Sequence, residues 1–230
     1  MDDIPQIKID TLRKRLMQWG KNNTRDFPWR KNLTPYSVLI SEIMLHRTRA
    51  KQVVDKYLIF MKKYPDFKSI CNAELNEIKK DLRSLGLYWR TEMLYALACF
   101  VCEKYHCELP LNKEELMKLP GIGEYISSAI LCFVCNISAP ILDTNTVRII
   151  SRVFGIEMND SSRRRKKYMN IMKRIIDSVP CRDFSYAMID FGSLICKKIN
   201  PQCDNCPLQD ICNYYLENVK TGDGNVSHKR

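Results

Sequence analysis

The chain has 230 residues, enough to bury one large core or two smaller ones. Its 37 Lys and Arg against 26 Asp and Glu give a net charge of +11, which favours a polyanionic partner. A hydrophobic content of 45% with only 8 Gly and 10 Pro excludes a wholly disordered, collagenous or low-complexity chain. Because no apolar run reaches the ~18 residues that span a bilayer, and the polar start MDDIPQIKID is unlike a secretory signal, we expect an intracellular protein without a membrane partner.

Apolar residues recur at helical spacing between turn signals in the first half of the chain. A helix is expected to begin at Thr34-Pro35, because a capping residue precedes a proline in the first turn. Its apolar residues are Val38, Leu39, Ile43 and Met44. The next segment predicts one apolar stripe, formed by Val53, Val54, Tyr57, Leu58 and Met61.

The remaining helices follow in the same way. Residues 92–104 predict a buried helix, and Asn112 with Glu115 resembles a capping box at the start of another. Pro120-Gly121 ends that helix, and a new one is expected near Glu124, followed by helices over 145–154 and 165–178. Alternating strand patterns are almost absent, so the predicted fold class is all-α. The polar tail over residues 219–230 is expected to be mobile.

Four of the 11 cysteines lie in one short segment, at the spacing C-x6-C-x2-C-x5-C; these are Cys196, Cys203, Cys206 and Cys212. Four thiolates are the usual ligand set of a [4Fe–4S] cluster, and Pro201 and Pro207 favour irregular backbone that wraps such a group. Structural zinc is the alternative, although zinc sites usually combine two C-x2-C pairs or Cys with His. The spacing therefore predicts an iron–sulfur cluster.

The other cysteines are interpreted as core residues. The pairs Cys99/Cys102 and Cys132/Cys135 lie in apolar helical stretches, where buried thiols are inert. Cys107 and Cys181 receive the same interpretation. An odd cysteine count without an export signal also argues against a framework of disulfides.

Residues 116–129 read LMKLPGIGEYISSA, the pattern of a helix–hairpin–helix. Gly121 and Gly123 allow a tight turn and a close approach to a ligand. Their amides, together with the start of the next helix, are suited to bind a DNA phosphate, a contact that carries no sequence information. The alternative is an ordinary helical corner.

A basic run follows further along the chain, at Arg163, Arg164, Arg165, Lys166 and Lys167. The cap-like Asn159-Asp160-Ser161 precedes it. Such a run is usually a solvated helix face, but beside a phosphate-binding hairpin it extends the expected contact with the DNA backbone.

The hairpin, the segment ILDTNTVRIISR and the four cysteines occur in the order that is typical of the helix–hairpin–helix DNA glycosylase superfamily. The chain resembles its endonuclease III and MutY branch over roughly residues 10–215. The resemblance implies a two-lobed fold: a helical barrel over 29–135, and a cluster lobe over 136–215 joined by the helix within 1–28, with residues 216–230 as a tail. It also implies that the substrate base swings out of the duplex into a cleft.

The resemblance implies three catalytic positions. Asp143 matches the catalytic aspartate, although alone it is equally well a helix cap. Glu42 matches a glutamate of the MutY and thymine-glycosylase branches that contacts the flipped base, the alternative being a buried ion pair with an arginine. Tyr125 stands where lyases carry a lysine and mismatch thymine/uracil glycosylases a tyrosine. Because tyrosine forms no imine, we expect hydrolysis without efficient strand cleavage.

Four further positions are implied as DNA contacts. Asn145 is expected to bond the sugar-phosphate or to cap a helix. His46 and Arg47 lie in the loop that fills the gap left by the flipped base, and Tyr88 aligns with a wedge tyrosine of MutY-like enzymes. For His46 and Tyr88 the alternative is simple packing. The chain stops soon after the cysteines, without the domain that MutY-type enzymes append to read 8-oxoguanine, which lowers the case for adenine removal.

Three functions are therefore weighed. The first is a monomeric, monofunctional DNA glycosylase that removes thymine or uracil opposite guanine from double-stranded DNA. The second is adenine removal from mispairs with guanine or 8-oxoguanine. The third is a non-catalytic iron–sulfur DNA-binding protein, which would need neither Glu42 nor Asp143.

Overall fold

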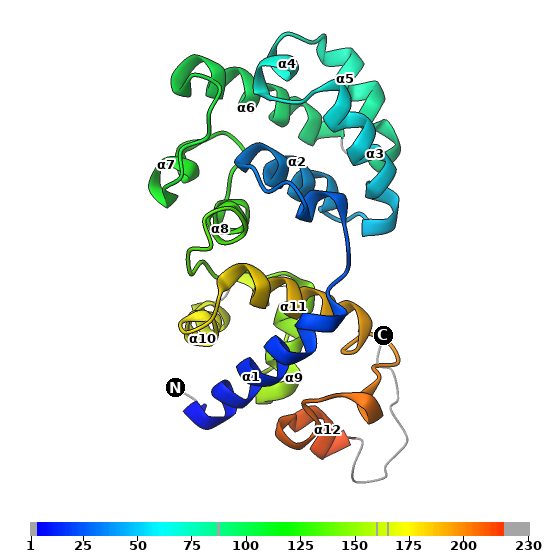
Figure 1. The fold of residues 1–230 in the computed structure, drawn as a ribbon, viewed down its shortest axis with the longest axis vertical. Helices are drawn as coiled ribbons and strands as arrows, with labels where there is room; N and C mark the ends of the chain where they lie inside the picture. Colours follow the sequence, from blue (N-terminus) through cyan, green and yellow to red (C-terminus); the bar gives the residue numbers. More distant parts are fainter. Residues whose placement is uncertain (1–3, 87, 160, 165, 219–230) are drawn as a thin grey trace. The chain divides into compact units, whose positions relative to one another are not determined.

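The structure, a computed structural model, describes residues 4–86, 88–159, 161–164 and 166–218. Every regular element over these ranges is a helix, which confirms the predicted all-α class (Figure 1). The chain divides into two compact units, which are described separately below. One unit is Asp26–Ile137, and the other joins Met1–Arg25 to Ser138–Arg230. None of the described helices combines the length and apolar character needed to cross a membrane.

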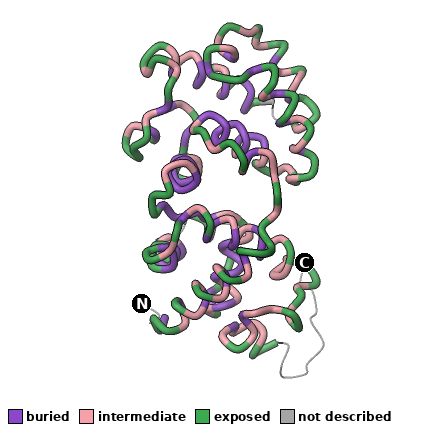
Figure 2. Tube along the Cα trace, viewed as in Figure 1, coloured by how far each residue is buried: buried purple, intermediate pink, exposed green. Residues whose placement is uncertain are grey.

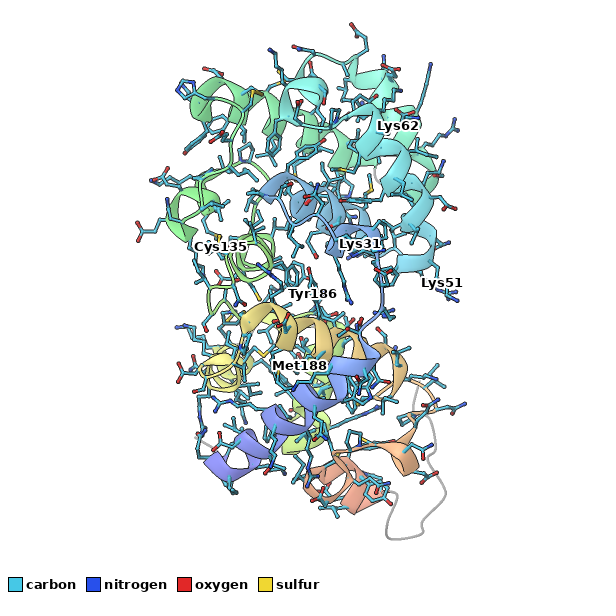
Figure 3. All side chains as sticks on the ribbon, in the orientation of Figure 1. Lys31, Lys51, Lys62, Cys135, Tyr186 and Met188 are labelled. Atoms are coloured by element: carbon cyan, nitrogen blue, oxygen red, sulfur yellow. A yellow bond between two sulfur atoms is a disulfide. The ribbon has the colours of Figure 1, made fainter. Side chains whose placement is uncertain are left out.

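The Asp26–Ile137 unit is built around α2 and α8, which pack against each other and are largely buried (Figure 2). In chain order it contains η1 (Pro28–Arg30), α2 (Pro35–Leu45), α3 (Ala50–Lys63), α4 (Phe67–Cys71), α5 (Leu75–Leu82), η2 (Arg83–Leu85), α6 (Tyr88–Tyr105), α7 (Lys113–Lys118) and α8 (Glu124–Phe133). α3 also packs on α2, and α6 packs on α4 and α5. Lys51 and Lys62 are exposed on α3, so this helix keeps a charged outer face (Figure 3).

The second unit is organised by α11, a buried helix against which α1 and α9 pack. Its elements are α1 (Gln6–Asn23), α9 (Thr144–Phe154), η3 (Ser162–Arg164), α10 (Lys166–Ile176), α11 (Cys181–Leu194), η4 (Cys203–Asn205), η5 (Gln209–Ile211) and α12 (Asn213–Asn218). Met188, labelled in Figure 3, is fully buried on α11. Trp19 of α1 meets Phe191 of α11 edge to face, with ring centroids 5.2 Å apart.

Several local signals predicted their helices correctly. Thr34 caps α2, and its side chain and that of Ser37 form a reciprocal capping box. The Asn112 side chain accepts from the amide of Glu115 at 2.8 Å and so caps α7. The helices expected over 145–154 and 165–178 are α9 and α10. Residues 216–218 belong to α12, and the predicted tail beyond them lies outside the described residues.

Two predictions about packing are wrong. Leu58 is 52% exposed, because the buried stripe of α3 follows Val53, Tyr57 and Phe60 at spacings of four and three residues. Cys102 and Cys107 are not free core thiols, since a disulfide joins them. The chain turns back after α6 through residues with positive φ, including Cys107 at 64°, and this turn brings Cys102 and Cys107 together. Cys132 and Cys181, also interpreted as core thiols, are disulfide-bonded as well. The helix α11 was not predicted.

Candidate functional site

The hairpin between α7 and α8 depends on Gly121. This residue has φ of +78°, and a Cβ there would lie 2.1 Å from the sulfur of Met93 on α6. Both its backbone angle and its close packing therefore require glycine. The turn is closed by the amide of Ile122, which donates to the carbonyl of Leu119 at 3.2 Å. This is the tight turn that the sequence predicted.

The start of α8 has a different character. Gly123 is the N-cap, and no side chain caps the helix at this position. The first amides of a helix have no partner within the helix, and its dipole attracts negative charge. A Cβ built on Gly123 would meet no other atom within 4 Å, so the space on that side is open. The geometry is suited to an external anion such as a DNA phosphate.

Asp143 is the N-cap of α9. Its Oδ1 accepts from the amides of Asn145 and Thr146 at 2.9 and 2.7 Å, and Thr146 completes a capping box. Its Oδ2 accepts from the Asn145 side chain at 3.0 Å. The capping alternative weighed from the sequence is therefore observed. The cap fixes the carboxylate in one orientation, and the residue remains half-exposed.

Arg148 was not singled out from the sequence, and it supports Asn145 at the start of α9. Its guanidinium donates to the side-chain oxygen of Asn145 at 2.7 Å and to the carbonyls of Gly192 and Cys196 at 2.7 and 2.8 Å. Burial lowers the pKa of Arg148. A Cβ at Gly192 would lie 2.5 Å from the Cβ of Asn145, so α11 approaches closely here. A basic residue within an apolar-periodic helix was the signal in the sequence.

Glu42 and Tyr125 belong to the other unit. Glu42 is half-buried on α2 between the buried residues Ser41 and Ile43. Tyr125 is half-buried in the first turn of α8. The expected placement of both residues on helices is therefore observed, and the sequence carries no lysine at residue 125.

His46 and Arg47 lie directly after α2 and are exposed. His46 is fixed by Arg90 of α6, whose guanidinium donates to the His46 carbonyl at 2.8 Å and contacts its ring Nδ1 at 2.5 Å. Arg47 adopts φ of 62°, which is unusual for a residue other than glycine. Tyr88 is the first residue of α6, and its side chain lies outside the described residues.

The four cysteines of the C-x6-C-x2-C-x5-C segment line one small pocket together with Arg152. Burial raises the pKa of Cys206 to about 12, and the nearby Cys196, Cys212 and Cys203 contribute further. Burial and two of the same neighbours also raise the pKa of Cys203. The four cysteines therefore line the same pocket and affect one another's pKa.

Positive and polar groups surround these sulfurs. Arg152 of α9 donates to the sulfur of Cys196 at 3.4 Å and to the carbonyl of Lys197 at 2.7 Å. Burial also raises the pKa of Cys212; the amide of Leu208 bonds Cys206 and that of Tyr215 bonds Cys212, and each partly offsets the rise in the pKa of its thiol. Such donors suit thiolates that ligate an iron–sulfur cluster. Over the described ranges, no group of three or more His, Cys, Asp or Glu side chains is arranged to hold a metal ion.

The basic run lies at the start of α10. Arg163, Arg164, Lys166 and Lys167 are exposed, and Arg165 lies outside the described residues. Asn159 fixes the preceding turn, since its side chain accepts from the amide of Ser161 at 3.1 Å. The predicted cap is therefore present, although it precedes η3 and not α10 itself.

Comparisons with known proteins agree with this geometry. The sequence profile of the HhH-GPD superfamily of base excision DNA repair proteins matches residues 40–175. The chain is 36% identical to the thymine-DNA glycosylase of Aeropyrum pernix, over 90% of this chain and 96% of that protein. It is 34% identical to the thymine/uracil-DNA glycosylase of Methanothermobacter thermautotrophicus, over 94% and 98%. A solved structure of a thermostable thymine-DNA glycosylase superposes with a TM-score of 0.86 at 33% identity, over 91% of this chain and 97% of that one.

Proposed function

Because the chain belongs to the HhH-GPD superfamily of base excision DNA repair proteins, we propose that it is a monofunctional DNA glycosylase that removes thymine or uracil mispaired with guanine. The observation that carries this proposal is its similarity, over nearly the full length of both chains, to relatives named for thymine or uracil. The hairpin, the capped Asp143 and the tyrosine at 125 are consistent with that chemistry.

Asp143 supplies the negative charge that the reaction needs. Cleavage of the N-glycosidic bond places positive charge on the sugar, and a carboxylate fixed nearby stabilises that charge or activates water. The three donors on Asp143 come from the start of its own helix, so its position requires no rearrangement on binding. Asn145 then serves as a support for the carboxylate and as a contact to the sugar-phosphate.

Glu42 and Tyr125 act on the base. Glu42 is assigned to hydrogen bonding or protonation of the departing pyrimidine, which makes the base a better leaving group. Tyr125 packs against the base, and its phenol cannot form the imine that a lysine forms with the sugar. Water therefore adds to the anomeric carbon of the sugar as the bond from that carbon to the base nitrogen breaks, the base leaves with a proton, and the abasic strand stays intact.

Each of the two units contributes its own contacts to DNA. In the Asp26–Ile137 unit, the Gly121–Gly123 turn and the start of α8 bind a phosphate, while the segments of His46, Arg47 and Tyr88 lie beside the space left by the extruded base. In the other unit, the basic run at α10 contacts the backbone. We assign a monomeric enzyme that acts on double-stranded DNA.

Cys196, Cys203, Cys206 and Cys212 are proposed to hold a [4Fe–4S] cluster, which supplies structural cross-linking of the C-terminal segment. Purified protein should contain about four iron atoms and absorb in the visible range. Zinc in place of iron would contradict the assignment. Substituting Cys203 by Ser should lower both the iron content and the melting temperature.

A panel of duplexes tests the activity. Each duplex carries one G·T, G·U, A·G or A·8-oxoguanine pair, and alkali after incubation reveals abasic sites. We expect cleavage after alkali at G·T and G·U, and little without alkali. Excision of adenine alone would favour the second function, which Glu42 and Asn145 also suit. Intact bases throughout would favour the third, a non-catalytic DNA-binding protein.

The Tyr125→Lys variant tests the absence of lyase action directly. A lysine amine there should attack the sugar and form a Schiff base that borohydride traps. The trapped protein–DNA product should be absent in wild type and in Tyr125→Phe. A folded variant that excises the base but yields no trapped product would show that residue 125 lies away from the sugar.

A further inference from the structure

Trp89 is a large apolar side chain that the described structure leaves in solvent. It is the second residue of α6, and 63% of its surface is exposed. The other two tryptophans are packed: Trp29 is 5% exposed and stacks on Phe27, and Trp19 meets Phe191. An exposed indole contributes little to the core, and its wide apolar face is available to stack on a ligand.

The indole of Trp89 packs against an arginine that is itself held in place. The guanidinium carbon of Arg90 lies 5.0 Å from the centroid of the Trp89 ring, within the range of a cation–π contact. Arg90 itself is only 7% exposed and is fastened to His46 by the two contacts described above. The contact with Arg90 restricts the Trp89 ring, so little conformational entropy is lost when a ligand covers the exposed surface of the ring.

Positive charge gathers at the same place. Burial lowers the pKa of Arg90, and the neighbouring charge of Arg47 lowers it further. The Nε of Arg90 is buried and has no hydrogen-bond partner among the described residues. The exposed Arg47 is held in the left-handed region. We name the group His46, Arg47, Trp89 and Arg90 the Trp89 surface. Its like charges favour an anionic partner.

We propose that Trp89 stacks on an unpaired nucleobase of DNA while Arg47 contacts the adjacent phosphate. A nucleic acid offers an aromatic base beside a negatively charged phosphate, and an indole beside two arginines is suited to recognise that pair of groups. This inference rests on the proposed function, because base removal leaves a base without its partner. It adds Trp89 to the residues that the family resemblance implied.

Stacking on Trp89 predicts a selectivity. In a matched duplex every base is already stacked on its neighbours, so the indole gains nothing. In a duplex with an abasic site the opposite base has lost its pairing partner, so it leaves the stack at lower cost and is available to the indole. Trp89 should therefore raise the affinity for the abasic duplex and leave that for the matched duplex unchanged.

Fluorescence anisotropy with a stable tetrahydrofuran abasic site opposite guanine, and with the matched duplex, measures both affinities. Trp89→Ala should weaken abasic binding about 10-fold and matched binding by less than about twofold. Trp89→Phe should restore most of the loss. Ile59→Ala, which removes a side chain of similar exposure (60%) from α3 of the same unit, is the matched control and should change neither affinity.

Salt dependence separates the indole from the arginine. Arg47→Ala should reduce the slope of log affinity against log salt by about one, whereas Trp89→Ala should leave the slope unchanged. Equal losses on both duplexes in Trp89→Ala, or no loss on the abasic duplex, would overturn the proposal. Neither binding assay requires catalysis, so failure of wild type to excise a base would refute the proposed function without deciding this inference.

Discussion

The starts of α8 and α9 differ in how their first backbone amides are capped. Both helices begin at an N-cap residue in extended conformation, Gly123 at φ −101° and Asp143 at φ −101°. No side chain caps α8, whereas the Asp143 carboxylate accepts from two amides of α9 and Thr146 completes the capping box. The start of α8 is therefore open to an external anion, whereas the start of α9 already carries the Asp143 carboxylate.

The contrast shows how one kind of local geometry serves two kinds of chemistry. Unpaired amides at a helix start bind a phosphate and hold DNA without regard to sequence. The same amides, when a carboxylate accepts from them, orient that carboxylate, which we propose acts on the sugar. Substitutions that exchange or remove these features should therefore separate DNA binding from base removal.

The largest effect is expected from Asp143→Asn. Asparagine caps helices as well as aspartate, so the free energy of unfolding should change by less than about 0.5 kcal/mol. The charge is lost, and single-turnover excision of thymine from a G·T duplex should fall about 100- to 1000-fold. Thermal melting checks the first expectation and denaturing gels after alkali the second. Excision within a few-fold of wild type would contradict the role of the carboxylate.

Arg148→Met should have the next largest effect, and it acts on stability. The side chain is 8% exposed, and its loss leaves the carbonyls of Gly192 and Cys196 without their donor. Urea unfolding should show a loss of about 2–4 kcal/mol. Excision should also fall, because Asn145 loses its support. Arg148→Lys keeps the charge but not the planar guanidinium, so its stability should lie between those of wild type and Arg148→Met. Unchanged stability would show that water satisfies these carbonyls.

These two positions also show what the sequence can predict. Caps at Thr34, Asn112 and Asp143 are local signals, because the cap and its amide lie three residues apart or fewer. Arg148 is different, since its partners lie at residues 192 and 196, on segments that only folding brings together. Arg90 likewise meets His46 across 44 residues.

The errors have the same origin. Leu58 lies at the edge of a helical stripe, where the sequence pattern cannot decide between core and solvent. The Cys102–Cys107 disulfide depends on a left-handed turn, and the sequence has no glycine there that would have predicted such a turn. The cysteine spacing at 196–212, by contrast, is a local pattern, and the structure gathers those four side chains around one pocket.

Gly123→Asp gives α8 the kind of cap that α9 has. The backbone there is extended and a Cβ meets nothing within 4 Å, so the fold should accept it. The new cap should raise stability by about 0.5–1 kcal/mol. Its charge would occupy the amides that a phosphate needs, so affinity for a stable abasic duplex should fall about 10-fold.

Two matched variants sharpen this test. Gly123→Asn caps the helix without adding a charge and should weaken DNA binding less than Gly123→Asp. Gly123→Ala adds neither a cap nor a charge, so its DNA affinity should stay close to that of wild type. Anisotropy titrations and melting curves measure the two quantities on the same samples. A Gly123→Asp variant that is stabilised and still binds DNA as wild type would show that the phosphate is held elsewhere.

The smallest effect is expected from Thr146→Val, which removes one half of the α9 cap. The hydroxyl of the fully buried Thr146 accepts from the Asp143 amide at 2.9 Å, and valine has nearly the same shape without it. Stability should fall by about 1 kcal/mol. Excision should fall less than about fivefold, because Oδ1 keeps both of its own amide donors. Ser37→Ala, which breaks the equivalent box at α2, should cost similar stability and leave excision unchanged. A loss of activity in Thr146→Val as large as in Asp143→Asn would mean that the hydroxyl, and not the helix start, positions the carboxylate.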